Sequence, residues 1–352
     1  MADYEKLMKK CIQLAKKGEG NTAPNPMVGC VVLNKNNEII STGYHHKYGK
    51  NHAERDALLK LKNGEEKDGT LIVNLEPCSH YGKTPPCADL IIERKLKKVV
   101  IGCKDNNPKV NGGGIKKLKD ANIEIVTGVL EKECKELNKI FFTNIEEKRT
   151  FVALKTATTI DGKIATHNGD SKWITSNKSR LYGKKLRKKY SAILTSSETV
   201  IKDNPQMLHK TKIILDKNLR TNFDSEIYKN GHIIIAINEN KNIENLSIPN
   251  NVEFLKCKVS NNNIDLKDLL SKLFEKKITS IFVESGGTLS GSFIKENLVD
   301  TLYQFIAPKI TNDNNSKSCF NGDNINLITE CKEYKVKTIK KLEHDIFIEY
   351  TK

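Results

Sequence analysis

Long apolar runs are missing from this sequence. The longest, residues 233–237, has the length of a strand, whereas a helix needs about 20 apolar residues to cross a bilayer. Residues 1–6 lack the apolar stretch of a signal peptide. We therefore expect a soluble cytoplasmic protein with no membrane partner.

The chain also lacks a disulfide framework and is poor in tryptophan. It has nine cysteines, an odd number, scattered from Cys11 to Cys331. Without a secretory signal these are expected to be reduced thiols, and a cluster among them would indicate a metal site. Trp173 is the only tryptophan, and by itself it could equally well be a core aromatic.

Charge is not concentrated in any one segment. The 59 Lys and Arg against 43 Asp and Glu give a formal net charge of +16, but the lysines are dispersed among acidic residues. Nucleic-acid binding favours a concentrated patch, so we expect no nucleic-acid partner, although the net charge keeps that class open. Small anionic substrates, phosphates above all, explain a positive field equally well.

The length of 352 residues suits two domains of roughly 150 residues each. In the first domain the apolar pattern predicts strands at 28–33, 38–43, 71–75, 98–102 and 123–127, and helices at 3–18, 53–62, from 86, at 115–121 and a long one ending near 144. Strands that alternate with helices indicate a largely parallel α/β sheet. The first two strands are expected to pair antiparallel.

The pattern resets near residue 148, so we predict domains at residues 1–147 and 148–352. Later strands are predicted at 151–156, 191–194, 212–215, 232–237, 252–255, 280–283, 300–307 and 346–350, with helices near 178–190, 266–276 and 291–296. The second domain is therefore also expected to be α/β.

Three side chains with zinc-ligand chemistry stand near the starts of predicted helices or just after a strand. His52 opens a helix, Cys78 follows the third strand, and Cys87 begins the next helix. One imidazole and two thiolates leave the fourth position of a tetrahedral zinc open for water, which is the pattern of a catalytic site, and one Zn²⁺ per chain is predicted. Glu54 is placed to take a proton from that water and deliver it to a substrate. The alternative is a structural zinc with an unrecognised fourth ligand, for which His80 is the obvious candidate.

The spacing of the two cysteines indicates which family of zinc deaminases the first domain resembles. Eight residues separate Cys78 from Cys87, whereas zinc deaminases of nucleosides and nucleic acids typically have a two-residue spacer. This long form, with the segments at residues 25–29 and 43–49, closely resembles the pyrimidine deaminase of riboflavin biosynthesis. The resemblance implies an N-terminal cytidine-deaminase-like domain, a three-layer α/β/α fold. It places Asn25, His45, His80 and Lys83 around a phosphorylated pyrimidine substrate.

The second domain carries two further motifs. Residues 283–289 form a Gly-Gly turn between a predicted strand and a helix, where backbone N–H groups can approach a phosphate. Together with residues 155–173, this order resembles the bifunctional deaminase/reductase family of riboflavin biosynthesis over essentially the whole chain. The resemblance implies a C-terminal domain of dihydrofolate-reductase-like α/β fold that uses NADPH. We also expect a homo-oligomer.

The same resemblance implies the reductase site residues. The substrate contacts would be Lys155, Ser171, Arg187, Lys210 and Glu284. The NADPH contacts would be Ala157, Trp173, Thr199, Asp203 and a phosphate-binding turn of Gly286, Gly287, Thr288, Leu289, Ser290, Gly291 and Ser292. For Arg187 a solvated helix face is an equal alternative, because lysines surround it in the sequence.

Three places depart from the family's pattern. Lys210 stands where a substrate-phosphate arginine is usual, and it offers a point charge in place of a bidentate fork. Lys217 replaces a hydroxyl residue and could favour the extra phosphate of NADP. Asn106 replaces a proline, and residues 111–114 lack an arginine between the last two glycines. These changes bear on reductase affinity and on one deaminase loop.

The resemblance implies two reactions. A hydrolytic deamination of the pyrimidine would come first, and an NADPH-dependent reduction of the ribosyl group to ribityl would follow. The alternatives are a zinc nucleic-acid base deaminase, a deaminase with an impaired reductase, and a nucleic-acid-binding protein with a structural zinc. The long cysteine spacing and the second domain count against the two nucleic-acid alternatives.

Overall fold

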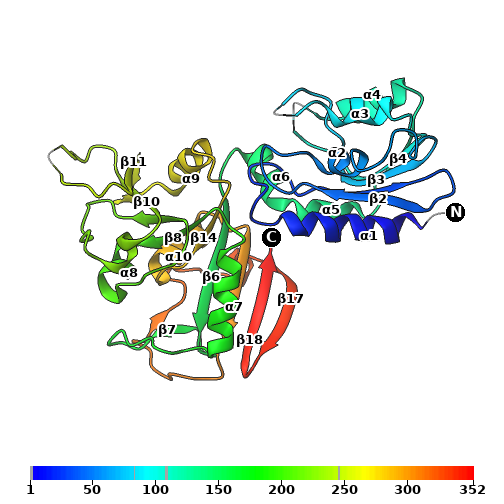
Figure 1. The fold of residues 1–352 in the computed structure, drawn as a ribbon. Coiled ribbons are helices and arrows are strands. Elements are labelled where there is room, and N and C mark those ends of the chain that lie inside the picture. Colours follow the sequence, from blue (N-terminus) through cyan, green and yellow to red (C-terminus); the bar gives the residue numbers. More distant parts are fainter. Residues whose placement is uncertain (1–2, 83, 108–109, 245) are drawn as a thin grey trace. The chain divides into compact units, whose positions relative to one another are not determined.

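The computed structural model describes residues 3–82, 84–107, 110–244 and 246–352 (Figure 1). The chain divides into two compact units, Met1–Lys148 and Arg149–Lys352. The predicted boundary, between residues 147 and 148, falls just before this division. Each unit has its own hydrophobic core, within residues 8–142 in the first and residues 152–302 in the second. Lys83, one of the predicted deaminase residues, lies outside the described residues.

The first unit is built on a five-stranded sheet in the order β2-β1-β3-β4-β5. Its strands are β1 (Gly29–Leu33), β2 (Ile39–Tyr44), β3 (Thr70–Leu75), β4 (Lys98–Cys103) and β5 (Glu124–Thr127). β1 pairs antiparallel with β2, as predicted, and β3, β4 and β5 run parallel. Every residue of β1 and β3 is buried, as expected for strands with helices on both faces.

Helices cover both faces of this sheet (Figure 1). They are α1 (Tyr4–Ala15), α2 (Ala53–Leu58), α3 (Cys87–Glu93) and α4 (Gly113–Asp120), with a 3₁₀ turn, η1 (Lys16–Gly18), after α1. Two glycines allow the helices to approach. A Cβ at Gly29 would lie 2.1 Å from the Cys11 carbonyl oxygen of α1, and one at Gly43 would lie 2.4 Å from the Ala53 carbonyl oxygen of α2. The unit is the three-layer α/β/α fold that the sequence predicts.

The long helix predicted to end near residue 144 is two helices. α5 (Glu131–Leu137) and α6 (Lys139–Glu147) are separated at Asn138, whose φ of −108° is not helical. The Asn138 amide donates to the Met27 carbonyl oxygen (2.9 Å) and accepts from the Met27 N–H (2.8 Å). This pair of bonds explains the break, which apolar periodicity does not report.

The second unit contains a nine-stranded sheet in the order β11-β10-β9-β8-β14-β6-β15-β18-β17. Its strands are β6 (Phe151–Thr158), β8 (Ala192–Ser196), β9 (Thr211–Leu215), β10 (His232–Asn238), β11 (Val252–Cys257), β14 (Ser280–Val283), β15 (Thr301–Ile306), β17 (Lys335–Leu342) and β18 (Asp345–Thr351). The strands from β11 to β15 in this order pair in parallel. β18 and β17 complete one edge antiparallel. Two short pairs lie outside the sheet, β12 (Val259–Ser260) with β13 (Asn263–Ile264) and β7 (Lys163–Ala165) with β16 (Lys317–Ser318).

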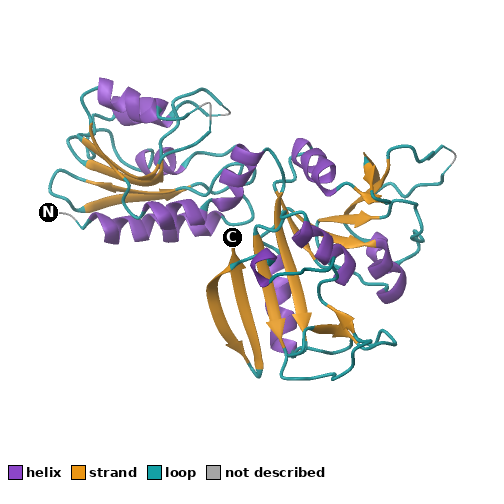
Figure 2. Ribbon diagram, turned by 180° about the vertical axis from the view of Figure 1, so that it is seen from behind, coloured by secondary structure: helices purple, strands orange, loops and turns teal. Residues whose placement is uncertain are grey.

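Helices lie on both faces of the second sheet (Figure 2). They are α7 (Asn177–Arg187), α8 (Ser197–Asp203), α9 (Leu266–Glu275) and α10 (Gly287–Lys295), with 3₁₀ turns η2 (Glu226–Lys229) and η3 (Ile328–Glu330). α9 follows directly from its sequence, because Asp265 caps its N-terminus and leucines at helical spacing are buried. Across the described residues, no helix has both the length and the apolar character that a membrane span requires.

The sequence pattern does not predict β17. Lysines at positions 335, 337, 340 and 341 remove the apolar alternation, and most residues of the strand are exposed. β17 is held by main-chain pairing with β18. Exposed lysines are typical of an edge strand, so the position of β17 in the sheet accounts for its composition.

Candidate active sites

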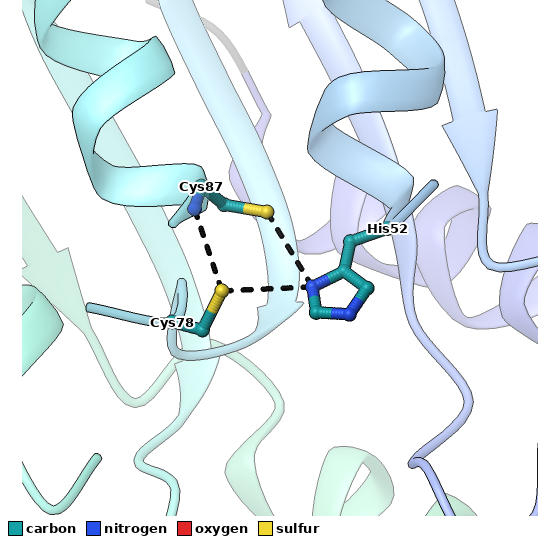
Figure 3. Close-up of side chains that lie close together, drawn as sticks. All are labelled: His52, Cys78 and Cys87. Atoms are coloured by element: carbon teal, nitrogen blue, oxygen red, sulfur yellow. Dashed lines mark hydrogen bonds between the residues drawn. The ribbon is translucent and has the colours of Figure 1, made fainter. Parts of the chain in front are cut away.

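The three predicted metal ligands meet in the first unit, close to the end of β3 (Figure 3). His52 is the N-cap residue of α2, and Cys87 is the first residue of α3. Cys78 lies in the loop that follows β3. The imidazole points at both sulfur atoms, so the three side chains face a common point (Figure 3).

The separations match a tetrahedral zinc. His52 Nδ1 lies 3.5 Å from Cys78 Sγ and 3.5 Å from Cys87 Sγ, and the three ligand atoms lie within 4.8 Å of one another. With Zn–S bonds of about 2.3 Å and Zn–N bonds of about 2.0–2.1 Å, tetrahedral angles place N and S about 3.6 Å apart. These residues therefore fit a zinc ion, with His52 ligating through Nδ1.

The charge of the group also suits a cation. The Cys87 backbone N–H, at the N-terminus of α3, donates to Cys78 Sγ (3.4 Å). Hydrogen bonds from Cys87 and His52 lower the pKa of Cys78 to about 4, which favours the thiolate that ligates metals. Among the described residues the ligand group does not include His80. Three ligands with a fourth position free favour a catalytic zinc over the structural alternative.

Glu54 lies in the first turn of α2, two residues from His52. Its side chain is buried, and its Oε2 has no hydrogen-bond partner in the described part of the chain. Burial raises the pKa of Glu54 to about 7. A buried oxygen without a partner is costly, so this carboxylate is suited to bonding a group that arrives with the ligand.

Asn25 and His45 are brought to the same place. His45 Nδ1 lies 2.9 Å from the Asn51 carbonyl oxygen, which assigns the ring proton to Nδ1, and Nε2 accepts from Asn25 Nδ2 (3.3 Å). Burial lowers the pKa of His45, which favours this neutral form. The His45 ring stands edge-on to His52, with ring centres 5.3 Å apart. His80 Nδ1 is buried and unpartnered within the described residues.

Glu76 organises the loop that borders this site, a role that the sequence pattern does not reveal. Its buried carboxylate accepts four backbone N–H groups, those of Asp105 (3.2 Å), Gly112 (3.2 Å), Gly114 (3.0 Å) and Ile115 (3.1 Å). Position 114 requires glycine, because a Cβ there would lie 1.9 Å from the Pro77 carbonyl oxygen. Glu76 therefore fixes the start of α4 against the Cys78 loop.

Three predicted reductase residues meet in the second unit, where β14 ends. Arg187 Nη2 lies 2.5 Å from Glu284 Oε2, and Lys155 Nζ lies 3.9 Å from Glu284 Oε1. The Arg187 side chain is 19% exposed, so the structure does not place it on a solvated helix face. Burial lowers the pKa of Lys155. Two cations thus face one carboxylate at the carboxyl end of a parallel strand, a usual place for a ligand site.

The other predicted reductase residues are more dispersed. Thr199 lies in the first turn of α8 and Asp203 ends that helix, exposed. Ala157 lies on β6, and Ser171 is half-buried. Trp173 is 62% exposed, and one face of its ring is covered by Arg180, whose Cζ lies 4.4 Å from the ring centre.

The predicted phosphate-binding turn, residues 286–292, spans the N-terminus of α10. Gly286 is the N-cap residue, and a Cβ there would meet nothing within 4 Å. A Cβ at Gly287 would instead lie 2.2 Å from the Ser318 carbonyl oxygen, and one at Gly291 would lie 1.7 Å from that of Asn321. The end of α10 therefore suits an anion, whereas these two later glycines are needed for packing.

Lys210 stands elsewhere in the second unit. It precedes β9, and its carbonyl oxygen accepts the His232 N–H at the start of β10. Because β9 and β14 belong to the same parallel set, Lys210 lies at the amino edge of these strands and Glu284 at the carboxyl edge. The structure does not bring Lys210 to the Arg187–Glu284 pair, and its contact with substrate stays a prediction.

Comparison with known proteins assigns both units. A family model of the RibD C-terminal domain matches residues 150–346, and a model of the cytidine and deoxycytidylate deaminase zinc-binding region matches residues 1–103. The riboflavin biosynthesis protein RibD of Actinobacillus pleuropneumoniae is 41% identical over 97% of this chain and 94% of its own length. The chain belongs to the RibD family. RibD of Aquifex aeolicus is also 41% identical, over 97% of this chain and 96% of its own.

Solved RibD structures share the fold. A Thermotoga maritima protein, described as a diaminohydroxyphosphoribosylaminopyrimidine deaminase/5-amino-6-(5-phosphoribosylamino)uracil reductase, is 38% identical with a TM-score of 0.85. The comparison covers 99% of this chain and 98% of that one. Acinetobacter baumannii RibD is 31% identical with a TM-score of 0.87, over 99% and 98% of the two chains.

Membership of the RibD family confirms the predicted fold class and the pairing of a deaminase with a reductase in riboflavin biosynthesis. It also supports the predicted cofactors, zinc for the first unit and NADPH for the second. The RibD reductase domain favours this function over the two nucleic-acid alternatives. Which residues hold substrate and cofactor stays a prediction.

Proposed function

We propose that this chain carries out two consecutive steps of riboflavin biosynthesis. The first unit removes an amino group of 2,5-diamino-6-(5-phosphoribosylamino)pyrimidin-4(3H)-one as ammonia. The second reduces the ribosyl group of 5-amino-6-(5-phosphoribosylamino)uracil to a ribityl chain. The observation that carries the proposal is the zinc-ligand geometry of His52, Cys78 and Cys87 beside buried Glu54, in a RibD-family chain.

In the deamination, Glu54 moves the protons. His52, Cys78 and Cys87 would hold the zinc, which would supply Lewis-acid activation of a water molecule. As the water oxygen bonds to the ring carbon that bears the amino group, Glu54 takes a proton from it and passes the proton to the ring nitrogen. A further transfer protonates the amino group, and the C–N bond breaks to release ammonia. The unpartnered Oε2 of Glu54 supports this role.

Asn25, His45, His80 and Lys83 hold the phosphorylated pyrimidine. The His45 Nε2 acceptor, kept free of a proton by the Asn51 bond to Nδ1, is suited to an N–H group of the ring. The Asn25 amide lies 3.3 Å from that nitrogen and can exchange its hydrogen bond to His45 for one to the substrate. The buried His80 Nδ1, which has no partner among the described residues, is suited to a polar group of the same ligand.

In the reduction, Lys155, Glu284 and Arg187 hold the opening sugar. NADPH, when bound by Trp173, Ala157, Thr199, Asp203 and the turn at 286–292, supplies the hydride that forms the new C–H bond at the anomeric carbon. The bond from that carbon to the ring oxygen breaks, and Lys155 gives the oxygen its proton. The lowered pKa of Lys155 supports this transfer. Ser171 and Lys210 complete the proposed substrate contacts.

Two further expectations belong to the proposal. We place the enzyme in the cytoplasm. None of its nine cysteines, all within the described residues, forms a disulfide, and a reducing compartment maintains cysteines in that state. We also expect a homo-oligomer that binds the phosphorylated pyrimidine and no nucleic acid.

A coupled assay tests the proposed function. Purified zinc-loaded protein receives the diaminopyrimidine substrate, and ammonia release and NADPH oxidation are followed separately. We expect ammonia first and NADPH oxidation after it. Glu54→Gln keeps the size of the side chain but not its basicity, so it should keep its zinc, lose at least about a hundredfold in ammonia release, and still oxidise NADPH when given the deaminated compound.

Each outcome of this assay decides between stated functions. Ammonia without NADPH oxidation would support the deaminase with an impaired reductase. Neither signal, with zinc bound, would refute the proposal. A Glu54→Gln enzyme as active as the unmodified one would remove Glu54 from the mechanism and leave both reactions in place.

A further inference from the structure

Trp173 presents a large apolar surface to solvent. It is the only tryptophan of the chain, and 62% of it is exposed. Burying an indole is strongly favourable, so an exposed indole held in a fixed position indicates a ligand surface. Lys309 holds the backbone at this point, because its Nζ donates to the Trp173 carbonyl oxygen (2.7 Å).

Arg180 holds the ring itself. The Arg180 guanidinium lies over one face of the indole, with Cζ 4.4 Å from the ring centre. Its Nη1 donates to the Thr175 carbonyl oxygen (2.8 Å), and its Nη2 donates to Asn177 Oδ1 (3.4 Å). The guanidinium is thus tied to Thr175 and Asn177 while it covers one face of the indole, and most of Trp173 remains exposed.

The position of Arg180 is unfavourable for α7. It lies in the first turn of the helix, whose first turn has no acidic residue, and a cation near a helix N-terminus opposes the helix dipole. Within the part of the chain that the structure describes, no carboxylate pairs with Arg180. The helix dipole therefore does not explain an arginine at this position, whereas its contact with Trp173 and its bonds to Thr175 and Asn177 do.

We propose that Arg180 is a positioning residue for NADPH. It covers one face of Trp173 and fixes the ring, so that the other face receives a planar ring of the dinucleotide. The inference rests on the proposed function, which places NADPH at Trp173. In this role Arg180 acts through the indole and does not touch the cofactor.

The single tryptophan makes this role measurable. In Arg180→Met and Arg180→Lys, Trp173 emission reports the indole directly, and acrylamide quenching reports how many of its faces are open. Lys178→Met is the matched control, because Lys178 is an exposed cation in the same turn of α7. We expect both Arg180 variants to be quenched more readily than the unmodified enzyme, and the control to be unchanged.

The same emission gives the NADPH affinity. Titration with NADPH, followed by quenching of Trp173, should show the dissociation constant raised about two- to fivefold in both Arg180 variants, the size of an exposed cation–π contact. Arg180→Lys should not restore the NADPH affinity, because an ammonium group lacks the planar surface that stacks on the indole. The KM for NADPH should rise with it, while kcat at saturating NADPH stays the same. Thermal unfolding of the variants separates this effect from a loss of fold.

The outcomes distinguish the inference from the proposed function. Unaltered NADPH affinity in both folded Arg180 variants would overturn the role of Arg180 and leave the reductase in place. Rescue by lysine, with a loss in Arg180→Met that grows at low salt, would overturn it in favour of direct contact with a cofactor phosphate. An unmodified enzyme that oxidises no NADPH would refute the proposed reductase, and the inference with it.

Discussion

Replacing Glu76 by glutamine should destabilise the first unit far more than an exposed carboxylate substitution does. The Glu76 carboxylate is buried and accepts four backbone N–H groups, two on each oxygen. Glutamine has the same shape but only one acceptor oxygen, and its NH₂ group would face the other two donors. Two buried N–H groups would then lose their acceptor.

The size of the effect follows from these bonds. A buried polar group left without its partner costs about 1–3 kcal/mol, so two such donors cost about 2–6 kcal/mol in the free energy of unfolding. The two bonds that remain also weaken, because they no longer involve a charge. A whole domain is stable by only about 5–15 kcal/mol. The variant should therefore leave the first unit marginally stable and loosen the start of α4.

The two units can be followed separately in this experiment. Zinc release into a colorimetric chelator during urea denaturation reports the first unit, and Trp173 emission reports the second. Glu124→Gln is the control, because Glu124 is an exposed residue of β5 in a surface pair with Lys98 and such pairs contribute about 0–1 kcal/mol. A zinc-release midpoint for Glu76→Gln no lower than that of Glu124→Gln would refute the reasoning. The urea midpoint of the second unit, followed by Trp173 emission, should be unchanged in both variants.

Three other outcomes follow from the structure. Arg187→Met should lower kcat/KM of the reductase at least about tenfold, because it removes the close cation from buried Glu284. It should also destabilise the second unit, as measured by Trp173 emission. Breaking a buried ion pair costs roughly 3–5 kcal/mol, and Lys155 offsets part of this cost. Burial lowers the pKa of Lys212 below its ordinary value of 10.5, so the unfolded chain binds more protons there than the folded chain, and stability rises as the pH approaches that value. In urea denaturation, the stability of the unmodified protein relative to Lys212→Met should therefore increase as the pH is raised towards 10.5, and parallel pH curves would contradict this. Removing zinc with a chelator should abolish ammonia release but leave NADPH oxidation intact when the deaminated compound is supplied, since the ligands all lie in the first unit. Loss of NADPH oxidation with that compound would contradict the separation.

Strands and ligands were predictable where a local pattern encodes them. The central residues of β3 and β10, 71–73 and 233–237, are buried and apolar. The two thiols and one imidazole lie at the starts of helices or just after a strand, which the sequence displays. The convergence of Lys155, Arg187 and Glu284 depended on the family resemblance, because their positions are far apart in the chain and only the order of the strands brings them together.

The features missed from the sequence depend on contacts between distant segments. The break at Asn138 is made by Met27, and Glu76 acts through backbone groups of a later loop. Neither leaves a periodic signal. β17 was missed because its pairing with β18 uses the main chain while its side chains remain in solvent. Arg180 was hidden among the basic residues of α7, where only its stacking on Trp173 distinguishes it.

The separate cores of the two units have a genetic consequence. Because the two cores share no residue in the described part of the chain, a lesion at Glu54 and a lesion at Arg187 damage different halves of the chain. Two defective proteins, each carrying one lesion, would between them still contain one sound deaminase and one sound reductase. Mixed in one vessel or expressed in one cell, they should complement each other, with the deaminated intermediate diffusing from one molecule to the other.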